Sequence, residues 1–137
     1  MSAATNAAMM AAMSSTAQLL VSGAMVGSAL PDANDSALAG LMVEGERAIF
    51  ASGGEDGAVL FTSSRVIVAE QVGIMNKRLA VKGFRRDSIF GYGIDPDKAV
   101  TLTLHGYFGL AALVFDQGFD PMLLSPWLGE TLALASS

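Results

Sequence analysis

Cysteine is absent from the 137-residue sequence, and histidine occurs only once, as His105. The lack of cysteine excludes a disulfide framework, thiolate metal sites and a cysteine nucleophile. A single histidine excludes a metal site built from several histidines of one subunit. Strand alternation places His105 on an outward face, and the sequence has neither a G-x-S-x-G motif nor a phosphate loop of the G-x-x-x-x-G-K type. We therefore expect no enzymatic activity, no cofactor and no bound metal.

Charged residues are also scarce. They form 15% of the sequence, and 13 acidic against 8 basic side chains give a net charge of −5. Nucleic-acid affinity depends on lysine and arginine displacing counterions, so this balance argues against a nucleic-acid partner. Only residues 75–98 are net positive, with six basic and three acidic side chains. They contain a candidate electrostatic interaction patch of Lys77, Arg78, Lys82, Arg85 and Arg86. We expect this patch to meet acidic groups of a neighbouring subunit; an acidic partner protein and an anionic membrane are the alternatives.

Hydrophobic residues, in contrast, form 52% of the chain. A single domain of this length can bury a core and still have apolar surface left over. Surface of that kind is usually covered by another molecule. We therefore expect a homo-oligomer, with the chain itself as its main partner.

The first 31 residues contain no charged side chain and consist mostly of Ala, Ser, Met and Gly. Apolar residues recur at intervals of three and four, which predicts a helix that is apolar around most of its circumference. Such a helix needs neighbours on several sides, and G-x-x-x-G spacing permits two helices to approach closely. We predict a helical leader over residues 1–42, followed by the main domain at residues 43–137. The candidate contacts between copies are Met13, Leu20, Gly23 and Gly27.

Two other interpretations of this leader remain open. Alanine and glycine could simply be abundant, and the leader partly frayed. The leader could also insert into a membrane, although it has no cationic residue of the kind that interfacial helices use for lipid headgroups. It lacks the positive region of a secretory signal and the bulky residues of a membrane span, so we expect a cytoplasmic protein.

From Val43 onward, short alternating segments separated by turn residues predict an all-β domain. The connections are mostly too short for a crossover helix, so neighbouring strands should pair antiparallel as a meander. In the stretch VTLTLH, alternation directs Val100, Leu102 and Leu104 inward. The seven expected strands are Glu46–Ser52, Ala58–Thr62, Arg65–Gln71, Arg78–Phe84, Ile89–Ile94, Ala99–His105 and Gly109–Asp116.

A helix is expected to follow the strands. Asp120-Pro121 and Ser125-Pro126 are both N-cap and first-turn signals, so the helix should begin at one of them and run to about Ala135. One apolar face carries Leu124, Trp127, Leu128, Thr131, Leu132 and Ala135. That face predicts packing against the sheet or across the mouth of a barrel.

The stretch VLFTSSRVIVAEQVG, residues 59–73, places two apolar runs around a tight polar corner. Its FTSSR segment resembles the F-T-x-x-R hairpin of the bacterial pleckstrin homology (PH) domain family. The resemblance continues through a glycine turn, the basic strand KRLAVKGF and the strand in DKAVTLTLHG, and covers roughly Leu41 to Leu134. Trp127 lies where PH-like domains often carry a helix tryptophan. The resemblance implies a mainly β fold with helices: a PH-like seven-stranded antiparallel barrel or sandwich, capped by a C-terminal helix and here preceded by the helical leader.

The corner itself has a structural explanation. Thr62 or Ser63 can bond backbone groups at the turn, and Arg65 is expected to pair with a carboxylate, either Glu46 or Asp87. The alternative is that Arg65 binds an anionic ligand. Eukaryotic PH domains that bind phosphoinositides carry basic residues around their first hairpin loop, whereas the loop SGGEDG is acidic. Phosphate capture of that type is therefore not expected.

The resemblance to bacterial PH domains implies an oligomer-forming module, which agrees with the excess of apolar residues. We therefore expect a self-assembling structural or scaffold protein that forms a ring or a filament through its leader. The alternative is a membrane-associated adaptor, anchored by the leader, whose PH-like domain binds a protein partner.

Overall fold

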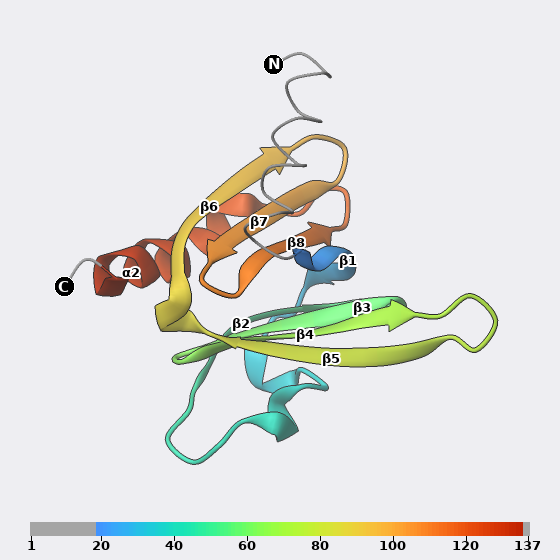
Figure 1. The fold of residues 1–137 in the computed structure, drawn as a ribbon, viewed down its shortest axis with the longest axis horizontal. Coiled ribbons are helices and arrows are strands. Elements are labelled where there is room, and N and C mark those ends of the chain that lie inside the picture. Colours follow the sequence, from blue (N-terminus) through green and yellow to red (C-terminus); the bar gives the residue numbers. More distant parts are fainter. Residues whose placement is uncertain (1–18, 136–137) are drawn as a thin grey trace.

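The structure is a computed structural model and describes residues 19–135, which form eight strands and one α-helix (Figure 1). The strands are β1 (Leu19–Ala29), β2 (Ala48–Gly53), β3 (Gly57–Thr62), β4 (Arg65–Val72), β5 (Arg78–Arg85), β6 (Ile89–Pro96), β7 (Val100–Gly106) and β8 (Gly109–Phe115). The α-helix is α2 (Ser125–Ala135), and the short 3-10 helices are η1 (Ala33–Asp35), η2 (Ala39–Leu41), η3 (Arg86–Ser88) and η4 (Pro121–Leu124).

The strands follow the order β5-β4-β3-β2-β1-β8-β7-β6. Strands β2 to β5 form one antiparallel meander and β6 to β8 form another. The two meanders lie in separate layers, and α2 lies at one end of the domain (Figure 1). Within the described residues, β5 and β6 are consecutive in sequence but do not pair, so each is an edge strand.

The seven strands predicted from the sequence are confirmed, with ends that differ by at most two residues. Strand β7 shows why the prediction works: its residues alternate strictly between buried and half-buried positions. Val100, Leu102 and Leu104 point into the core, as alternation predicts for a strand with one covered face.

The helical leader is wrong for residues 19–29, which form the additional strand β1. This strand runs parallel to β8 along most of its length and pairs antiparallel with β2 at Ser28 and Ala29. It thereby joins the two meanders into one sheet. Three of its apolar residues, Val21, Ala24 and Val26, are buried in the main core, whereas Met25 is exposed. Residues 1–18 of the expected leader lie outside the described residues.

Glycine at position 27 is required where β1 crosses from one meander to the other. Gly27 has a φ of +76°, and a Cβ atom there would lie 2.1 Å from the carbonyl oxygen of Gly53. Side chains do not tolerate such a distance to a backbone atom. Gly27 therefore permits β1 to approach β2 closely at Gly53, and the close contact is between two strands rather than between two helices.

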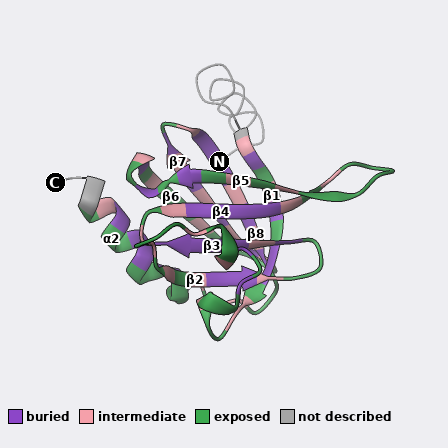
Figure 2. Ribbon diagram, turned by 90° about the horizontal axis from the view of Figure 1, so that it is seen from below, coloured by how far each residue is buried: buried purple, intermediate pink, exposed green. Residues whose placement is uncertain are grey.

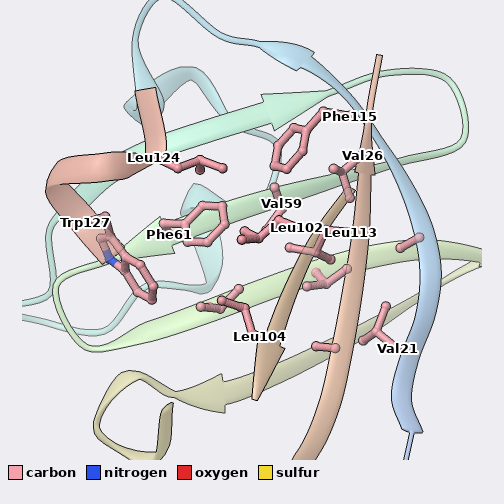
Figure 3. Packing of buried hydrophobic residues seen from close by; sticks show 14 of the residues in the cluster. Val21, Val26, Val59, Phe61, Leu102, Leu104, Leu113, Phe115, Leu124 and Trp127 are labelled. Atoms are coloured by element: carbon pink, nitrogen blue, oxygen red, sulfur yellow. The ribbon is translucent and has the colours of Figure 1, made fainter. Parts of the chain in front are cut away.

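The main core fills the space between the meanders and under α2 (Figure 3). Trp127 is 1% exposed, packs edge-on against Phe61 at a ring-centroid distance of 4.9 Å, and donates its indole N–H to the carbonyl oxygen of Thr62. The expected C-terminal helix is confirmed: Asp120 caps η4 through the backbone N–H of Met122, and α2 follows directly. The inward residues of this segment are Leu124, Trp127, Leu128 and Thr131, all buried.

A second, smaller core lies on the outer face of the β2–β5 meander. Leu38 packs there on Leu60, Ile67 and Ala69, together with residues of the segment that carries η1 and η2. This segment covers β2, β3 and β4 from outside (Figure 2). The outer face of β5, however, contributes no residue to the second core.

Candidate interaction surface

The FTSSR corner closes around one carboxylate. Both oxygens of Glu46 accept hydrogen bonds from the guanidinium of Arg65, at 2.7 and 2.9 Å, and its side chain is 1% exposed. Further bonds come from the hydroxyls of Thr62 and Ser64 and from the backbone N–H of Val43. Thr62 in turn accepts from two backbone N–H groups of the turn, as expected of a hydroxyl residue at this position.

These bonds stabilise the ionised form of the carboxylate. The Arg65 guanidinium lowers the pKa of Glu46 far below its ordinary value of 4.5, against the opposing effect of burial. The prediction of a fold-stabilising ion pair at Arg65 is confirmed, with Glu46 as the partner. Asp87, the other candidate, pairs with Arg85 instead. The corner is therefore part of the framework that fixes the β3–β4 turn.

The five residues of the expected basic patch do not share one surface in the structure. Arg86 does not reach the surface: it is 4% exposed and lies over the Trp127 ring at 4.7 Å. Its guanidinium donates to the Thr131 hydroxyl at 2.6 Å and to the carbonyl oxygens of Trp127 and Ser63 at 3.1 and 3.2 Å. Arg86 thus fastens α2 to the sheet. The prediction that it belongs to an outward-facing basic patch is wrong.

The other four basic residues remain at least partly accessible. Lys82 is half-buried. It pairs with Glu70 at 2.8 Å and donates a hydrogen bond to the carbonyl oxygen of Leu20. Arg85 is exposed and pairs with Asp87. Lys77 and Arg78 are exposed at the end of the β4–β5 hairpin, and neither takes part in an ion pair within the described chain.

The residues predicted to join copies through the leader are placed differently. Leu20, Gly23 and Gly27 lie in β1, where Leu20 packs against the main core. Gly23 has a φ of +108°, and the closest atom to a Cβ there would be a methyl of Val114 at 3.9 Å. The helix–helix contact at these glycines is therefore wrong. Met13 lies outside the described residues.

The surface that sequence reasoning missed lies on β5. Val81 is the register partner of Ala69 and Leu79 that of Gln71, so both side chains point to the outer face of the meander. Leu79 is 57% exposed and Val81 51% exposed. Beside them, the second core ends at the buried side chains of β4. We define Leu79 and Val81 as the β5 outer face. The alternation of KRLAVKGF places them on one side of the strand, but the flanking basic residues Arg78 and Lys82 drew the interpretation toward charge.

Aromatic side chains are exposed near the opposite edge. Phe90 and Tyr92 on β6 are 58% and 42% exposed, and Tyr107, in the β7–β8 turn, is 86% exposed. The rings of Phe90 and Tyr107 meet edge-on at 5.5 Å. Both edge strands of the described sheet thus have exposed apolar side chains.

The β2–β3 loop forms an acidic hollow against β1. Glu55, Asp56 and Asp116 line it together with Met25 and Gly27, in a volume of about 270 Å³. Three carboxylates make this hollow unfavourable for phosphate, in agreement with the expectation from the loop sequence. Across residues 19–135, no group of three or more His, Cys, Asp or Glu side chains is arranged to hold a metal ion. His105, on β7, is half-buried.

The part of the chain that the structure describes contains no helix long and apolar enough to cross a bilayer. No protein-family model matches the sequence, and no curated protein matches it either.

Two solved structures are similar to this one. The first is a pleckstrin homology domain from Shewanella amazonensis SB2B, with a TM-score of 0.54 and 17% identity over 70% of this chain and 92% of that chain. The second is a DUF1696 family protein with a pleckstrin-homology domain from Shewanella loihica PV-4, with a TM-score of 0.57 and 17% identity over 80% of this chain and 97% of that chain. Identity this low establishes the fold alone. The PH-like fold expected from the FTSSR corner and the strand order is therefore confirmed.

Proposed function

We propose that this chain is a structural or scaffold protein without enzymatic activity, which assembles into a homo-oligomer through β5. The observation that carries the proposal is the combination, on one strand, of an edge that no strand within residues 19–135 pairs with and an exposed apolar face. The non-enzymatic part rests on the sequence, with its single histidine and no cysteine.

An unpaired edge strand is a template for another strand, and monomeric proteins usually protect it. Proline, bulges and short length are common protective features. Strand β5 has eight residues, contains no proline and pairs with β4 without any register shift. Charge is the protective feature that β5 does have, because Arg78, Lys82 and Arg85 are cationic. Two of these charges are paired, Lys82 with Glu70 and Arg85 with Asp87. The edge therefore remains suited to pairing.

The β5 outer face supplies the apolar area that such a contact needs. Burying a fully exposed Leu or Val side chain contributes about 1.5–3 kcal/mol, and Leu79 and Val81, about half exposed, have about half of that left to contribute. The two residues of each copy can therefore supply part of a weak association. A contact between β5 of one copy and β6 of the next would be head-to-tail and give a ring or a filament, whereas β5 paired with β5 would give a two-fold dimer.

The test is the mass of the intact chain by size-exclusion chromatography with light scattering, compared with the double variant Leu79→Lys/Val81→Lys. The two lysines replace exposed side chains, so the fold should persist, and far-UV circular dichroism checks this. We expect the wild type to be a multiple of 14.1 kDa and the variant to be smaller.

A matched control is Met122→Lys, which also places a lysine at an exposed apolar position, 69% exposed on η4. This control should keep the mass of the wild type. If the control and the double variant reduce the mass equally, β5 is not the contact. A wild type that is monomeric at micromolar concentration would refute the proposal as a whole.

A further inference from the structure

The tip of the β4–β5 hairpin exposes two apolar side chains almost completely. Ile74 is 93% exposed and Met75 94% exposed, higher than any other exposed large hydrophobic residue of the described chain. In both views the hairpin projects from the body of the domain, on the side away from α2 (Figures 1 and 2). The burial colours of Figure 2 show its tip as exposed. Neither side chain belongs to either core cluster.

The projection is built into the backbone. The β4–β5 ladder runs without a register shift from Arg65 and Arg85 at its base to Val72 and Arg78 at its end. Gly73 then turns the chain with a φ of +91°, where a Cβ atom would lie 2.5 Å from the carbonyl oxygen of Asn76. Glycine is therefore required for this turn, which presents the two apolar side chains at the end of a paired ribbon.

The charge next to the tip has one sign. Lys77 and Arg78 follow Met75 after a single residue, Asn76, and no acidic residue occurs between Glu70 and Asp87. Among the ion pairs of residues 19–135, none includes Lys77 or Arg78. Two exposed apolar side chains followed by two unpaired cations form a pattern suited to the interface of an anionic bilayer, where apolar groups enter below the headgroups and cations contact phosphate.

The acidic β2–β3 loop lies behind the tip. The backbone N–H of Gln71 donates to the carbonyl oxygen of Asp56, which places this loop beside the end of β4. Ile74 is three residues further along the chain, at most about 10 Å at the rise of a strand. That limit is comparable to the screening length of about 8 Å at physiological salt, so salt reduces the repulsion between these carboxylates and an anionic surface at the tip.

We infer that the tip, residues 73–77, inserts Ile74 and Met75 into the surface of an anionic membrane while Lys77 and Arg78 bind its headgroups. This contact is separate from the proposed self-assembly, because it uses the hairpin tip and not the β5 outer face. It also needs no phosphate pocket, because the apolar side chains enter the bilayer surface and the cations contact the charge of the headgroups.

Flotation of the full chain with vesicles tests the inference. The two compositions are phosphatidylcholine alone and phosphatidylcholine with phosphatidylserine. We expect binding to the acidic vesicles that weakens as salt rises. Ile74→Asn/Met75→Asn should reduce the apparent affinity about tenfold or more, because both apolar side chains lose their burial in lipid. Lys77→Gln/Arg78→Gln should reduce it by a similar factor at low salt.

The control variant is Met122→Asn, whose residue is exposed on η4, just before α2. It should bind as the wild type does. The inference is overturned if the wild type does not prefer acidic vesicles, or if the Ile74/Met75 variant binds them unchanged. It is also overturned if that variant lowers the oligomeric mass, since the tip would then be a protein contact. None of these flotation results depends on whether the Leu79/Val81 variant dissociates, so the two proposals can fail separately.

Discussion

Replacement of Glu46 by glutamine should destabilise the domain far more than its position near the surface indicates. The carboxylate is 1% exposed and accepts five hydrogen bonds, two of them from Arg65. Removing one partner of a buried ion pair costs about 3–5 kcal/mol, and the 31% exposure of Arg65 places this pair at or below the lower limit. We expect Glu46→Gln to lose about 2–3 kcal/mol of unfolding free energy, or about 10 °C in Tm.

The same variant should alter how stability depends on pH. Because the pKa of Glu46 is lowered in the folded state, its contribution is complete above its ordinary value of 4.5 and is lost as pH falls below that value. Chemical denaturation at pH 7 and at about pH 3 should therefore show a difference between wild type and Glu46→Gln that narrows in acid. Glu44→Gln is the matched control, because Glu44 is exposed and makes no ion pair in the described chain. An equal difference at both pH values, or equal effects of the two variants, would refute this explanation of the corner.

Two other predictions concern residues whose roles differ from those expected. Gly27→Ala should lower the unfolding free energy by about 3 kcal/mol or more, through overpacking against Gly53 and strain at positive φ, whereas Gly23→Ala should lower it by only about 1–2 kcal/mol. Urea denaturation measures both, and equal losses would contradict the close approach of β1 to β2. Arg86→Gln should lower the Tm by several degrees, because it breaks two hydrogen bonds to α2 and one to the β3–β4 turn, while Arg85→Gln should change it by less than about 2 °C. A thermal scan in which Arg85→Gln is the more damaging of the two would contradict the buried anchor.

The β domain was predictable because local signals and burial agree there. Strands such as β7 alternate strictly, and their turns contain the residues that such turns favour. The partner of Arg65 was also within reach of sequence reasoning, since Glu46 was one of the two carboxylates expected to pair with it. In such segments the sequence pattern and the fold impose the same constraint.

Strand β1 was misjudged because periodicity does not separate helix from strand in a small-residue segment. Gly23 and Gly27 have the spacing of a helix–helix contact. In the structure, however, both have positive φ angles and belong to an irregular strand with three register shifts. Long-range pairing with β8 decides the conformation, and no local signal reports it. The position of Arg86 was hidden for a similar reason: η3 follows β5 directly, and this turn directs its side chain under α2.

The interaction surface could be only half predicted. Charge is visible in a sequence, so the region around Lys77 and Arg78 was identified. Exposure is not visible, because Leu79 and Val81 resemble the core residues of any other strand. Their exposure follows from the place of β5 at the edge of the sheet, beyond the segment that covers β2 to β4.

The most direct test of the central claim is the mass of the intact chain in solution, measured by light scattering across a range of concentrations. Self-assembly through β5 predicts a multiple of 14.1 kDa that decreases when Leu79 and Val81 are both replaced by lysine. A mass of 14.1 kDa at every micromolar concentration, unchanged by that replacement, would contradict it.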